Sequence, residues 1–376
     1  MKRNVLICIP CLLTGGTEIQ TYSLIEALIA ANYHPIVACY FEYSPSMVER
    51  YRATGATVEL MNKDGKRTIG VWTTLKHLWN GFRRIIKKHS PQIAHVQYMA
   101  PGAMPIVVLR ALGMKHIIST AHTSADIYPS LKQIHWLSQY ILTAFQCITL
   151  KAETSFFGNC NLFSESMHLR GHGNHFTIYN NLPSYITPAT NPRKGSPQTI
   201  GVVSRLEKIK GMDLVIPAFA HIYRSHPEMR LLVVGDGSLR ELMEQQIGEY
   251  KIPDSAVIFT GQQSQEFLQD YYDKIDILLM PSRSEGFGLT AIEGMARGCV
   301  PVVADTGGLP EVIEDGISGR LHKSGNWESI VPVLEELIIS SEQFRLYSSE
   351  ALNRAMIFSS ERYKMLISSL YNKILL

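Results

Sequence analysis

Two glutamates separated by seven residues stand in the segment with the clearest chemical pattern. Glu285 and Glu293 belong to Pro281-Ser-Arg-Ser-Glu-Gly-Phe-Gly-Leu-Thr-Ala-Ile-Glu, which follows an apolar run and enters a predicted helix. Its glycines let the backbone approach a ligand closely, and the amides at a helix start attract anionic oxygens. Glu293, about one turn inside the helix, is placed to hold ribose hydroxyls, while Glu285 stays on the loop. The residues predicted to line this loop are Gly286, Phe287, Gly288, Leu289 and Thr290.

Two cations occupy another loop that also follows an apolar run. Arg205 and Lys210 lie in Ser204-Arg-Leu-Glu-Lys-Ile-Lys-Gly, where the loop leads into a predicted helix. A guanidinium and an ammonium that reach one pyrophosphate neutralise it and stabilise the charge that develops on a departing oxygen. The structural alternatives are a solvated basic loop here and, around Glu285, a buried strand-loop-helix with surface glutamates.

The first half of the chain holds a glycine pair and two histidines of interest. Gly15 and Gly16 follow the first predicted strand and open a helix, so their amides can face a phosphate or a sugar; a plain tight turn is the alternative. His122 opens a loop after a strand, at the carboxyl edge where open α/β sheets bind ligands. His95 ends another strand and is interpreted as a core residue, so His122 is the preferred candidate.

Six cysteines without regular spacing favour a reducing, cytoplasmic compartment over a disulfide-stapled secreted fold. Cys8 and Cys11 form a C-x-x-C pair. A redox helix should begin at the first cysteine of such a pair, but Cys8 lies within a predicted strand. We therefore interpret both thiols as structural.

Short apolar runs alternate with longer amphipathic stretches along the whole chain, which is typical of βα units around mostly parallel sheets. The proline-rich stretch Asn181–Pro197 is the natural linker. We expect an α/β fold of two Rossmann-like domains, residues 1–185 and 186–358, with an amphipathic C-terminal helix over residues 359–376. The predicted strands are Asn4–Ile9, Pro35–Cys39, Gln92–Val96, His116–Thr120, Cys147–Leu150, Phe176–Tyr179, Thr199–Val203, Arg230–Val234, Val257–Thr260, Ile275–Met280 and Val300–Val303.

The first half of the chain is the basic one. The 376 residues are 45% hydrophobic, which fits two globular cores, and residues 1–190 hold 17 Lys and Arg against 9 Asp and Glu. Residues 72–89 predict a basic amphipathic helix with Trp72 and Trp79 on its apolar side. A sheet-packing face is the preferred interpretation of this helix, and contact with a membrane surface is the alternative. No apolar run reaches the length of a membrane span.

The two loops resemble those of the retaining glycosyltransferases of family 4, which have the GT-B fold. In that fold two Rossmann-like domains face each other across a cleft, and a C-terminal helix crosses back to the first domain. Glu285 and Glu293 match the E-x7-E motif of the family, and Arg205 with Lys210 matches its phosphate-binding pair. Further segments that resemble the family are Gly15-Gly16, Val234-Gly235-Asp-Gly-Ser238, Thr260-Gly261 and residues 302–311, with His122 as a cleft histidine.

The resemblance implies a role for each matching residue. In the family, the first glutamate lies beside the donor sugar, the second holds the nucleotide ribose, and the histidine meets the sugar or its phosphate. These roles carry over to Glu285, Glu293 and His122, and Gly235 joins the expected donor-binding residues. The implied reaction moves a sugar from a nucleoside diphosphate, with UDP the expected nucleotide, to an acceptor hydroxyl with retention of configuration. Bacterial surface polysaccharide, lipopolysaccharide or glycolipid synthesis is the expected setting.

The expected partners are a nucleotide-sugar donor and a glycan or lipid-linked acceptor, with peripheral contact at the cytoplasmic face of a membrane as an option and no nucleic acid. No cofactor and no catalytic metal are expected, since family members typically need no metal. The aspartates of residues 270–276 also follow i, i+3 spacing rather than the Asp-x-Asp of metal-dependent transferases.

Three other functions compete with this interpretation. A nucleotide-sugar epimerase or hydrolase of the same fold needs the same donor pocket, and a non-catalytic nucleotide-sugar-binding partner of a polysaccharide complex needs no chemistry. A dinucleotide-dependent oxidoreductase is disfavoured, because neither half carries Gly-x-Gly-x-x-Gly after its first strand.

Overall fold

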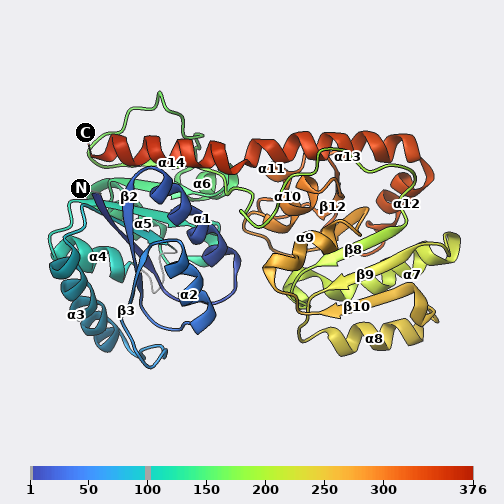
Figure 1. Ribbon diagram of the computed structural model, residues 1–376, viewed down its shortest axis with the longest axis horizontal. Helices are drawn as coiled ribbons and strands as arrows, with labels where there is room; N and C mark the ends of the chain where they lie inside the picture. Colours follow the sequence, from blue (N-terminus) through green and yellow to red (C-terminus); the bar gives the residue numbers. More distant parts are fainter. Residues whose placement is uncertain (1–2, 98–102, 376) are drawn as a thin grey trace. The chain divides into compact units, whose positions relative to one another are not determined.

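The computed structural model describes residues 3–97 and 103–375 and divides the chain into two compact units. Unit 1 comprises Met1–Asn181 together with Ser360–Leu376, and unit 2 comprises Leu182–Ser359. Each unit is a parallel sheet with helices on both faces (Figure 1). The predicted α/β fold class is therefore confirmed, and the chain passes between the units after Asn181 and again after Ser359.

The described part of unit 1 holds a seven-stranded parallel sheet in the order β3-β2-β1-β4-β5-β6-β7. Its strands are β1 (Arg3–Ile9), β2 (Tyr33–Cys39), β3 (Thr57–Leu60), β4 (Ile93–Gln97), β5 (His116–Ala121), β6 (Ala144–Cys147) and β7 (Asn174–Thr177). Its helices are α1 (Gly16–Ala30), α2 (Pro45–Ala53), α3 (Val71–His89), α4 (Met104–Ala111), α5 (Leu131–Tyr140), α6 (Leu150–Phe157) and α14 (Ser360–Ile374), with a 3-10 turn at Ala125–Ile127.

Two hydrophobic cores cover the two faces of this sheet. Helices α1, α2 and α14 pack on one face, where Tyr51 of α2 and Tyr371 of α14 are fully buried. Helices α3, α4 and α5 pack on the other face, where Leu78 and Phe82 of α3 are fully buried. Because both faces are covered, the central strands are continuous apolar runs rather than alternating ones.

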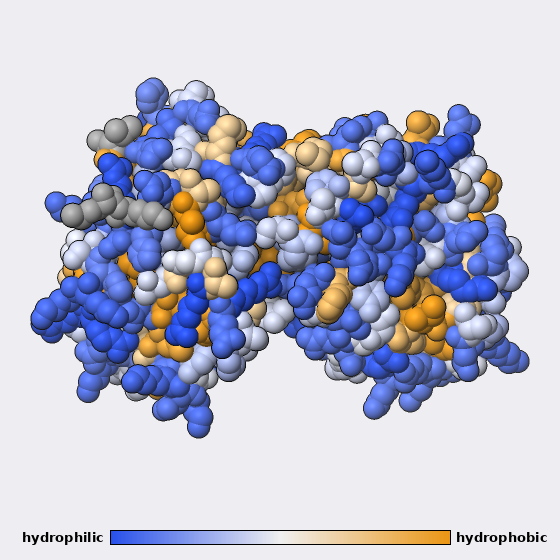
Figure 2. Space-filling view, viewed as in Figure 1, coloured by the Kyte–Doolittle hydropathy of each residue, from blue (hydrophilic) through white to orange (hydrophobic). Residues whose placement is uncertain are grey.

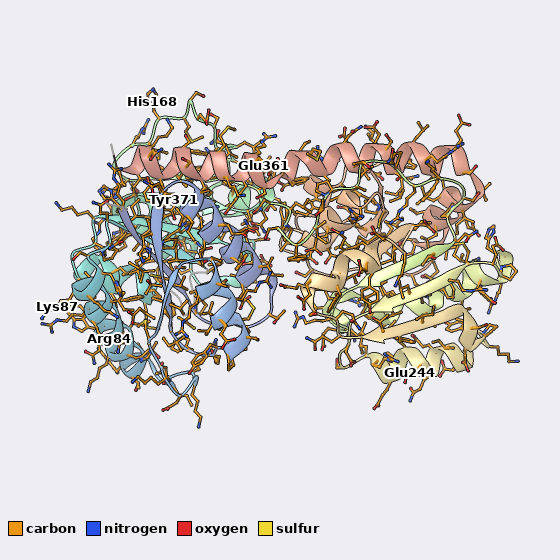
Figure 3. All side chains as sticks on the ribbon, in the orientation of Figure 1. Arg84, Lys87, His168, Glu244, Glu361 and Tyr371 are labelled. Carbon is orange, nitrogen blue, oxygen red and sulfur yellow. The ribbon has the colours of Figure 1, made fainter. Side chains whose placement is uncertain are left out.

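The C-terminal helix α14 is part of unit 1, as the family resemblance implies. The hydroxyl of Tyr371 lies 2.7 Å from Nδ1 of His95 in β4, and Tyr33 donates to Oδ1 of Asn372 at 2.9 Å. Tyr371 points from α14 toward the sheet (Figure 3). His95 also meets Thr120 at 2.6 Å through Nε2, so both ring nitrogens are partnered and His95 is a core residue.

The described part of unit 2 holds a six-stranded parallel sheet in the order β10-β9-β8-β11-β12-β13. Its strands are β8 (Thr199–Val203), β9 (Arg230–Val234), β10 (Val257–Gly261), β11 (Ile277–Met280), β12 (Val300–Ala304) and β13 (Arg320–His322). Its helices are α7 (Val215–Ser225), α8 (Arg240–Glu249), α9 (Leu268–Tyr272), α10 (Leu289–Ala296), α11 (Leu309–Val312), α12 (Val331–Ile339) and α13 (Ser341–Ala355). Its 3-10 turns are Lys208–Lys210, Met212–Leu214, Asp254–Ala256, Gln265–Phe267 and Met356–Phe358.

Several sequence predictions about elements are wrong. Leu150 begins α6 instead of ending a strand, because the hydroxyl of Thr149 accepts from the amide of Ala152 and caps the helix. The next strand ends at Thr177, two residues before the predicted end. On α3, Trp72 and Trp79 are exposed, although the sequence placed them on the sheet-facing side.

Candidate functional site

The cationic loop and the glutamate loop of unit 2 leave adjacent strands at the same edge of the sheet. Strand β8 pairs with β11 through Ile277 and Ile200, and the chain continues from β8 to β9 and β10 on one side. From β11 it continues to β12 and β13 on the other side. Ligands of open α/β sheets bind outside the carboxyl ends of strands at such a switch point. The fold therefore brings the two predicted loops to the expected place.

Lys210 and Glu285 form an ion pair at this edge. Nζ of Lys210 lies 2.6 Å from Oε2 of Glu285, and the two side chains are 23% and 15% exposed. The hydroxyl of Ser282 lies 3.5 Å from the same carboxylate oxygen. The structure thus joins two residues that are 75 positions apart in sequence and holds a carboxylate and an ammonium side by side, partly open to solvent.

Arg205 lies on the same loop as Lys210 but is not part of that ion pair. Its side chain is exposed, and within the described residues its guanidinium makes no hydrogen bond or ion pair. The neighbouring Glu207 accepts from the hydroxyl and the amide of Ser238 at 2.8 and 3.4 Å, and these bonds lower the pKa of its carboxyl. The loop is therefore anchored beside Arg205 while the guanidinium itself stays available to an anion.

Glycines pack the loops of this edge backbone against backbone. Gly235 has φ 135°, and a Cβ there would lie 1.9 Å from the carbonyl oxygen of Ser204. Gly307 has φ 55°, and a Cβ there would lie 1.7 Å from the carbonyl oxygen of Glu285. Only glycine fits such approaches. Gly307 is missing from the predicted site residues, although its position in a glycine pair after β12 was a usable signal.

Helix α10 starts at the end of the glutamate loop. Gly288 is its N-cap with φ 109°, and no described side chain caps the helix, so within residues 3–97 and 103–375 the first amides, including those of Leu289 and Thr290, have no side-chain acceptor. Phe287 is 3% exposed, and its ring packs against the ring of Phe358, with the two ring centroids 5.6 Å apart. The amides of this turn suit an anion, whereas the side chain of Phe287 belongs to the core.

Glu293 is buried inside unit 2 and bonded by two tyrosines. Tyr185 donates to Oε1 and Tyr272 to Oε2, each at 2.6 Å. Burial raises the pKa of the Glu293 carboxyl, and the two hydroxyls oppose that shift. Each carboxylate oxygen keeps one further acceptor position. The sequence offered no signal for this pair of tyrosines, because Tyr185 lies in the linker stretch and Tyr272 at the end of α9.

Arg283 braces the cationic loop, which the sequence analysis did not predict. Its guanidinium donates to both carboxylate oxygens of Asp213 at 2.6 and 2.8 Å and to the carbonyl of Lys208 at 2.8 Å. Its amide donates to the carbonyl of Ile209 at 2.9 Å. Such a bidentate, charge-assisted contact fixes orientation as well as distance, so Arg283 holds the turn that presents Lys210.

The predicted ligand residues of unit 1 lie at the carboxyl edge of its own sheet. Gly15 is the extended N-cap of α1 and Gly16 its first residue. His122 follows β5 and is buried, and its Nε2 lies 3.0 Å from Oε1 of Gln97. Burial lowers the pKa of His122 to about 4, so the ring is neutral at neutral pH. These three residues stay predicted ligand contacts.

The C-x-x-C pair has inert surroundings. Burial, and after it the carboxylate of Glu18, which accepts from the thiol at 3.3 Å, raises the pKa of Cys11 to about 12. Burial also raises the pKa of Cys8 well above its usual range. Thiolate formation is suppressed at both positions, which fits structural thiols. Within residues 3–97 and 103–375, no group of three or more His, Cys, Asp or Glu is arranged to hold a metal ion.

Two family models match the two halves of the chain. Residues 14–163 match the model described as Glycosyltransferase Family 4, and residues 186–354 match the model described as Glycosyl transferases group 1. Among curated proteins, a D-inositol 3-phosphate glycosyltransferase from Segniliparus rotundus is 33% identical over 170 residues. That match covers 44% of this chain and 38% of the relative, so the chain aligns with well under half of its length.

Solved structures match nearly the whole chain at low sequence identity. The Anabaena protein HepE, in complex with UDP, has a TM-score of 0.79 at 17% identity and covers 99% of this chain and 100% of its own. A glycosyltransferase from Rickettsia africae has a TM-score of 0.80 at 17% identity, and the match covers 100% of this chain and 99% of the Rickettsia chain. These likenesses confirm the predicted GT-B fold.

Proposed function

Since the chain belongs to the family 4 glycosyltransferases and has the GT-B fold, we propose that it transfers a sugar from a UDP-sugar to an acceptor hydroxyl with retention of configuration. The observation that carries the proposal is the Lys210–Glu285 pair at the switch point of unit 2, on whose cationic loop the guanidinium of Arg205 has no hydrogen-bond or ion-pair partner among the described residues. UDP bound to HepE, which has the same fold, supports the choice of nucleotide.

The proposed reaction exchanges one glycosidic bond for another. The bond from the anomeric carbon to the diphosphate oxygen breaks while the acceptor oxygen attacks from the same face. The acceptor proton passes to the departing phosphate, and UDP leaves. Arg205 and Lys210 stabilise the charge on that phosphate, and Glu285 orients the sugar. In this mechanism the two cations supply the charge neutralisation, so the proposal includes independence of a catalytic metal.

The other contacts of the donor follow from the same geometry. The amides at the start of α10, those of Gly288, Leu289 and Thr290, receive the diphosphate. Gly235 and Gly286 allow close backbone approach, and Glu293 accepts from the ribose hydroxyls at its remaining acceptor positions. Unit 1 is assigned the acceptor. The acceptor is proposed to be a growing surface glycan or glycolipid, reached from the cytoplasm with peripheral contact at the membrane.

A donor screen followed by product analysis tests this proposal. UDP-sugars are expected to raise the melting temperature, since a ligand at about 100 times its Kd stabilises the native state by about 2.7 kcal/mol. With the best donor and a panel of polyol and glycan acceptors, we expect a product whose anomeric configuration by NMR matches the donor and whose rate is unchanged by EDTA. Turnover of the donor without an acceptor would support an epimerase or hydrolase instead, and binding without turnover a non-catalytic partner.

Glu293→Gln is expected to raise the KM for the donor about tenfold, because a neutral amide replaces charge-assisted hydrogen bonds to ribose. In the wild-type chain the pKa of the Glu293 carboxyl is raised by folding, so the native chain binds the carboxyl proton more tightly than the unfolded chain does. The free energy of unfolding therefore falls as the pH rises from about 4.5 through the raised pKa, and the substitution removes that fall.

The matched control for this prediction is Glu342→Gln, which neutralises an exposed glutamate of α13. We expect no change in KM or in the pH dependence of unfolding for it. A donor KM equal to wild type in Glu293→Gln would remove Glu293 from the ribose contact.

A further inference from the structure

Helix α3 presents one stripe to solvent in which tryptophans alternate with cations. Trp72 and Trp79 are 83% and 39% exposed, while Thr74, Leu78 and Phe82 are buried on the opposite side. Spacings of three and four residues place side chains in a row along one face of a helix. The row consists of Trp72, Lys76, Trp79, Arg83 and Lys87, all of which are exposed. We call these five residues the α3 stripe.

The turn before α3 extends this surface with aliphatic side chains. Ile69 is 90% exposed and Val71 60% exposed, on either side of Gly70, whose φ of 92° makes the turn. Leaving such side chains in water costs about 25 cal/mol for each Å² of apolar surface. Two aliphatic residues next to an exposed tryptophan therefore favour a partner that accepts apolar side chains.

The surroundings of the α3 stripe are mainly basic. From Gly65 to Ala125 the sequence holds nine Lys and Arg and no Asp or Glu. Lys87 extends outward from α3 (Figure 3), and the surface over this helix is mainly hydrophilic in Figure 2. Glu59, from the neighbouring strand β3, is paired with Lys88 at 2.7 Å and with His89 at 2.8 Å, both beyond the stripe. The stripe itself meets no acidic side chain within the described residues.

We propose that the α3 stripe, with Ile69 and Val71, docks unit 1 on an anionic lipid bilayer. Tryptophan prefers the interface between headgroups and acyl chains, cations pair with anionic headgroups, and a helix that lies in the interface presents both on one face. This inference deepens the membrane contact of the proposed function. None of the helices in the described ranges combines the length and the hydropathy of a membrane span.

A lipid surface fits the stripe better than a nucleic acid. Single-stranded nucleic acids bind in grooves that combine cations with aromatic rings for stacking. The α3 stripe lies on the outward face of a helix, and the exposed side chains that lead into it, Ile69 and Val71, are aliphatic and cannot stack on bases. Aliphatic side chains do enter the headgroup region of a bilayer.

Co-sedimentation of the full chain with lipid vesicles tests the inference. The probes are vesicles of phosphatidylcholine alone and of phosphatidylcholine with phosphatidylglycerol, at low and high salt. We expect binding to the anionic vesicles only, weakened by salt. The double variant Trp72→Ala, Lys76→Glu should bind at least ~10-fold more weakly. The matched control is Leu346→Ala, Arg345→Glu on α13, which removes one exposed apolar side chain and reverses one exposed cation in unit 2.

The control variant is expected to bind within about twofold of wild type, and brominated lipids should quench tryptophan fluorescence more in the wild-type chain than in the variant that lacks Trp72. Equal binding to neutral vesicles, equal loss in both double variants, or α3-dependent binding to an oligonucleotide without vesicle binding would each overturn the inference. The sedimentation assay contains no donor or acceptor and therefore measures membrane binding alone. Sugar transfer to a soluble acceptor by the Trp72→Ala, Lys76→Glu variant tests the proposed function separately.

Discussion

Glu285→Gln is expected to lower kcat by about 100-fold or more while the KM for the donor changes by less than about threefold. The substitution keeps the shape of the side chain but removes the charge that faces Nζ of Lys210 at 2.6 Å. Lys210 then loses its partner, and the sugar loses the carboxylate that orients it in the transition state. Steady-state kinetics with the best UDP-sugar measures both effects, and Arg205→Ala should lower kcat as well.

The control for this prediction is Glu244→Gln. Glu244 also forms an ion pair, with Arg240 one helical turn away, but it extends from α8 into solvent (Figure 3). Breaking an exposed pair of this kind costs about 0.5 kcal/mol or less, so kcat should stay within about twofold of wild type. A wild-type kcat in Glu285→Gln would contradict the role assigned to this carboxylate.

The buried strands could be predicted closely because their sequences admit one interpretation. Strands β8 and β9 have the predicted bounds, since each is a continuous apolar run between polar turns. The edge strands β3 and β13 were not predicted. Val58 is the one buried residue of Thr57–Leu60, and Arg320–His322 spans three residues, so neither shows an apolar run. These edge strands are held by pairing with a neighbouring strand, and the residue pattern of the strand itself carries no sign of that pairing.

The orientation of α3 shows why periodicity alone placed the tryptophans wrongly. Apolar residues such as Leu75, Trp79 and Ile86 widen the apolar arc of this helix, so several rotations bury a similar area. The structure centres the buried face near Gly81, where a Cβ would lie 2.1 Å from the side chain of Met61. A small residue lets the helix approach the sheet closely, and that preference for a close approach outweighs the burial of Trp72.

The residues of the candidate site also divide into those that the sequence could predict and those that it could not. Lys210 and Glu285 could be predicted, because each follows an apolar strand and the carboxyl ends of parallel strands share one edge. The Arg283–Asp213 brace and the tyrosines around Glu293 could not, because each contact joins residues that are near only after the sheet has formed. Their side chains have no local pattern. Such supporting contacts decide the geometry of a site but leave no periodic or spaced signal in the sequence.

Gly307→Ala is expected to lower the free energy of unfolding of the chain by about 3 kcal/mol and transfer by at least about tenfold. Two costs add. Alanine disfavours the φ of 55° at this position by about 1 kcal/mol, and its Cβ would lie 1.7 Å from the carbonyl oxygen of Glu285. Relief of that overlap moves the backbone of Glu285, and a misplacement near 1 Å at a reacting centre costs about 100-fold in rate.

Gly316→Ala separates these two costs. Gly316 has φ 75°, so alanine meets the same backbone strain, but a Cβ there has no atom within 4 Å. We expect this control to lose only about 1 kcal/mol and to keep its transfer rate, as measured by thermal unfolding and by kinetics on the same preparations. If the two alanine variants lose equal stability and equal activity, backbone strain alone explains both, and the packing of Gly307 on Glu285 does not position the carboxylate. If only Gly307→Ala loses turnover, the loop after β12 is what holds Glu285 in place, through contact with its backbone rather than with its side chain.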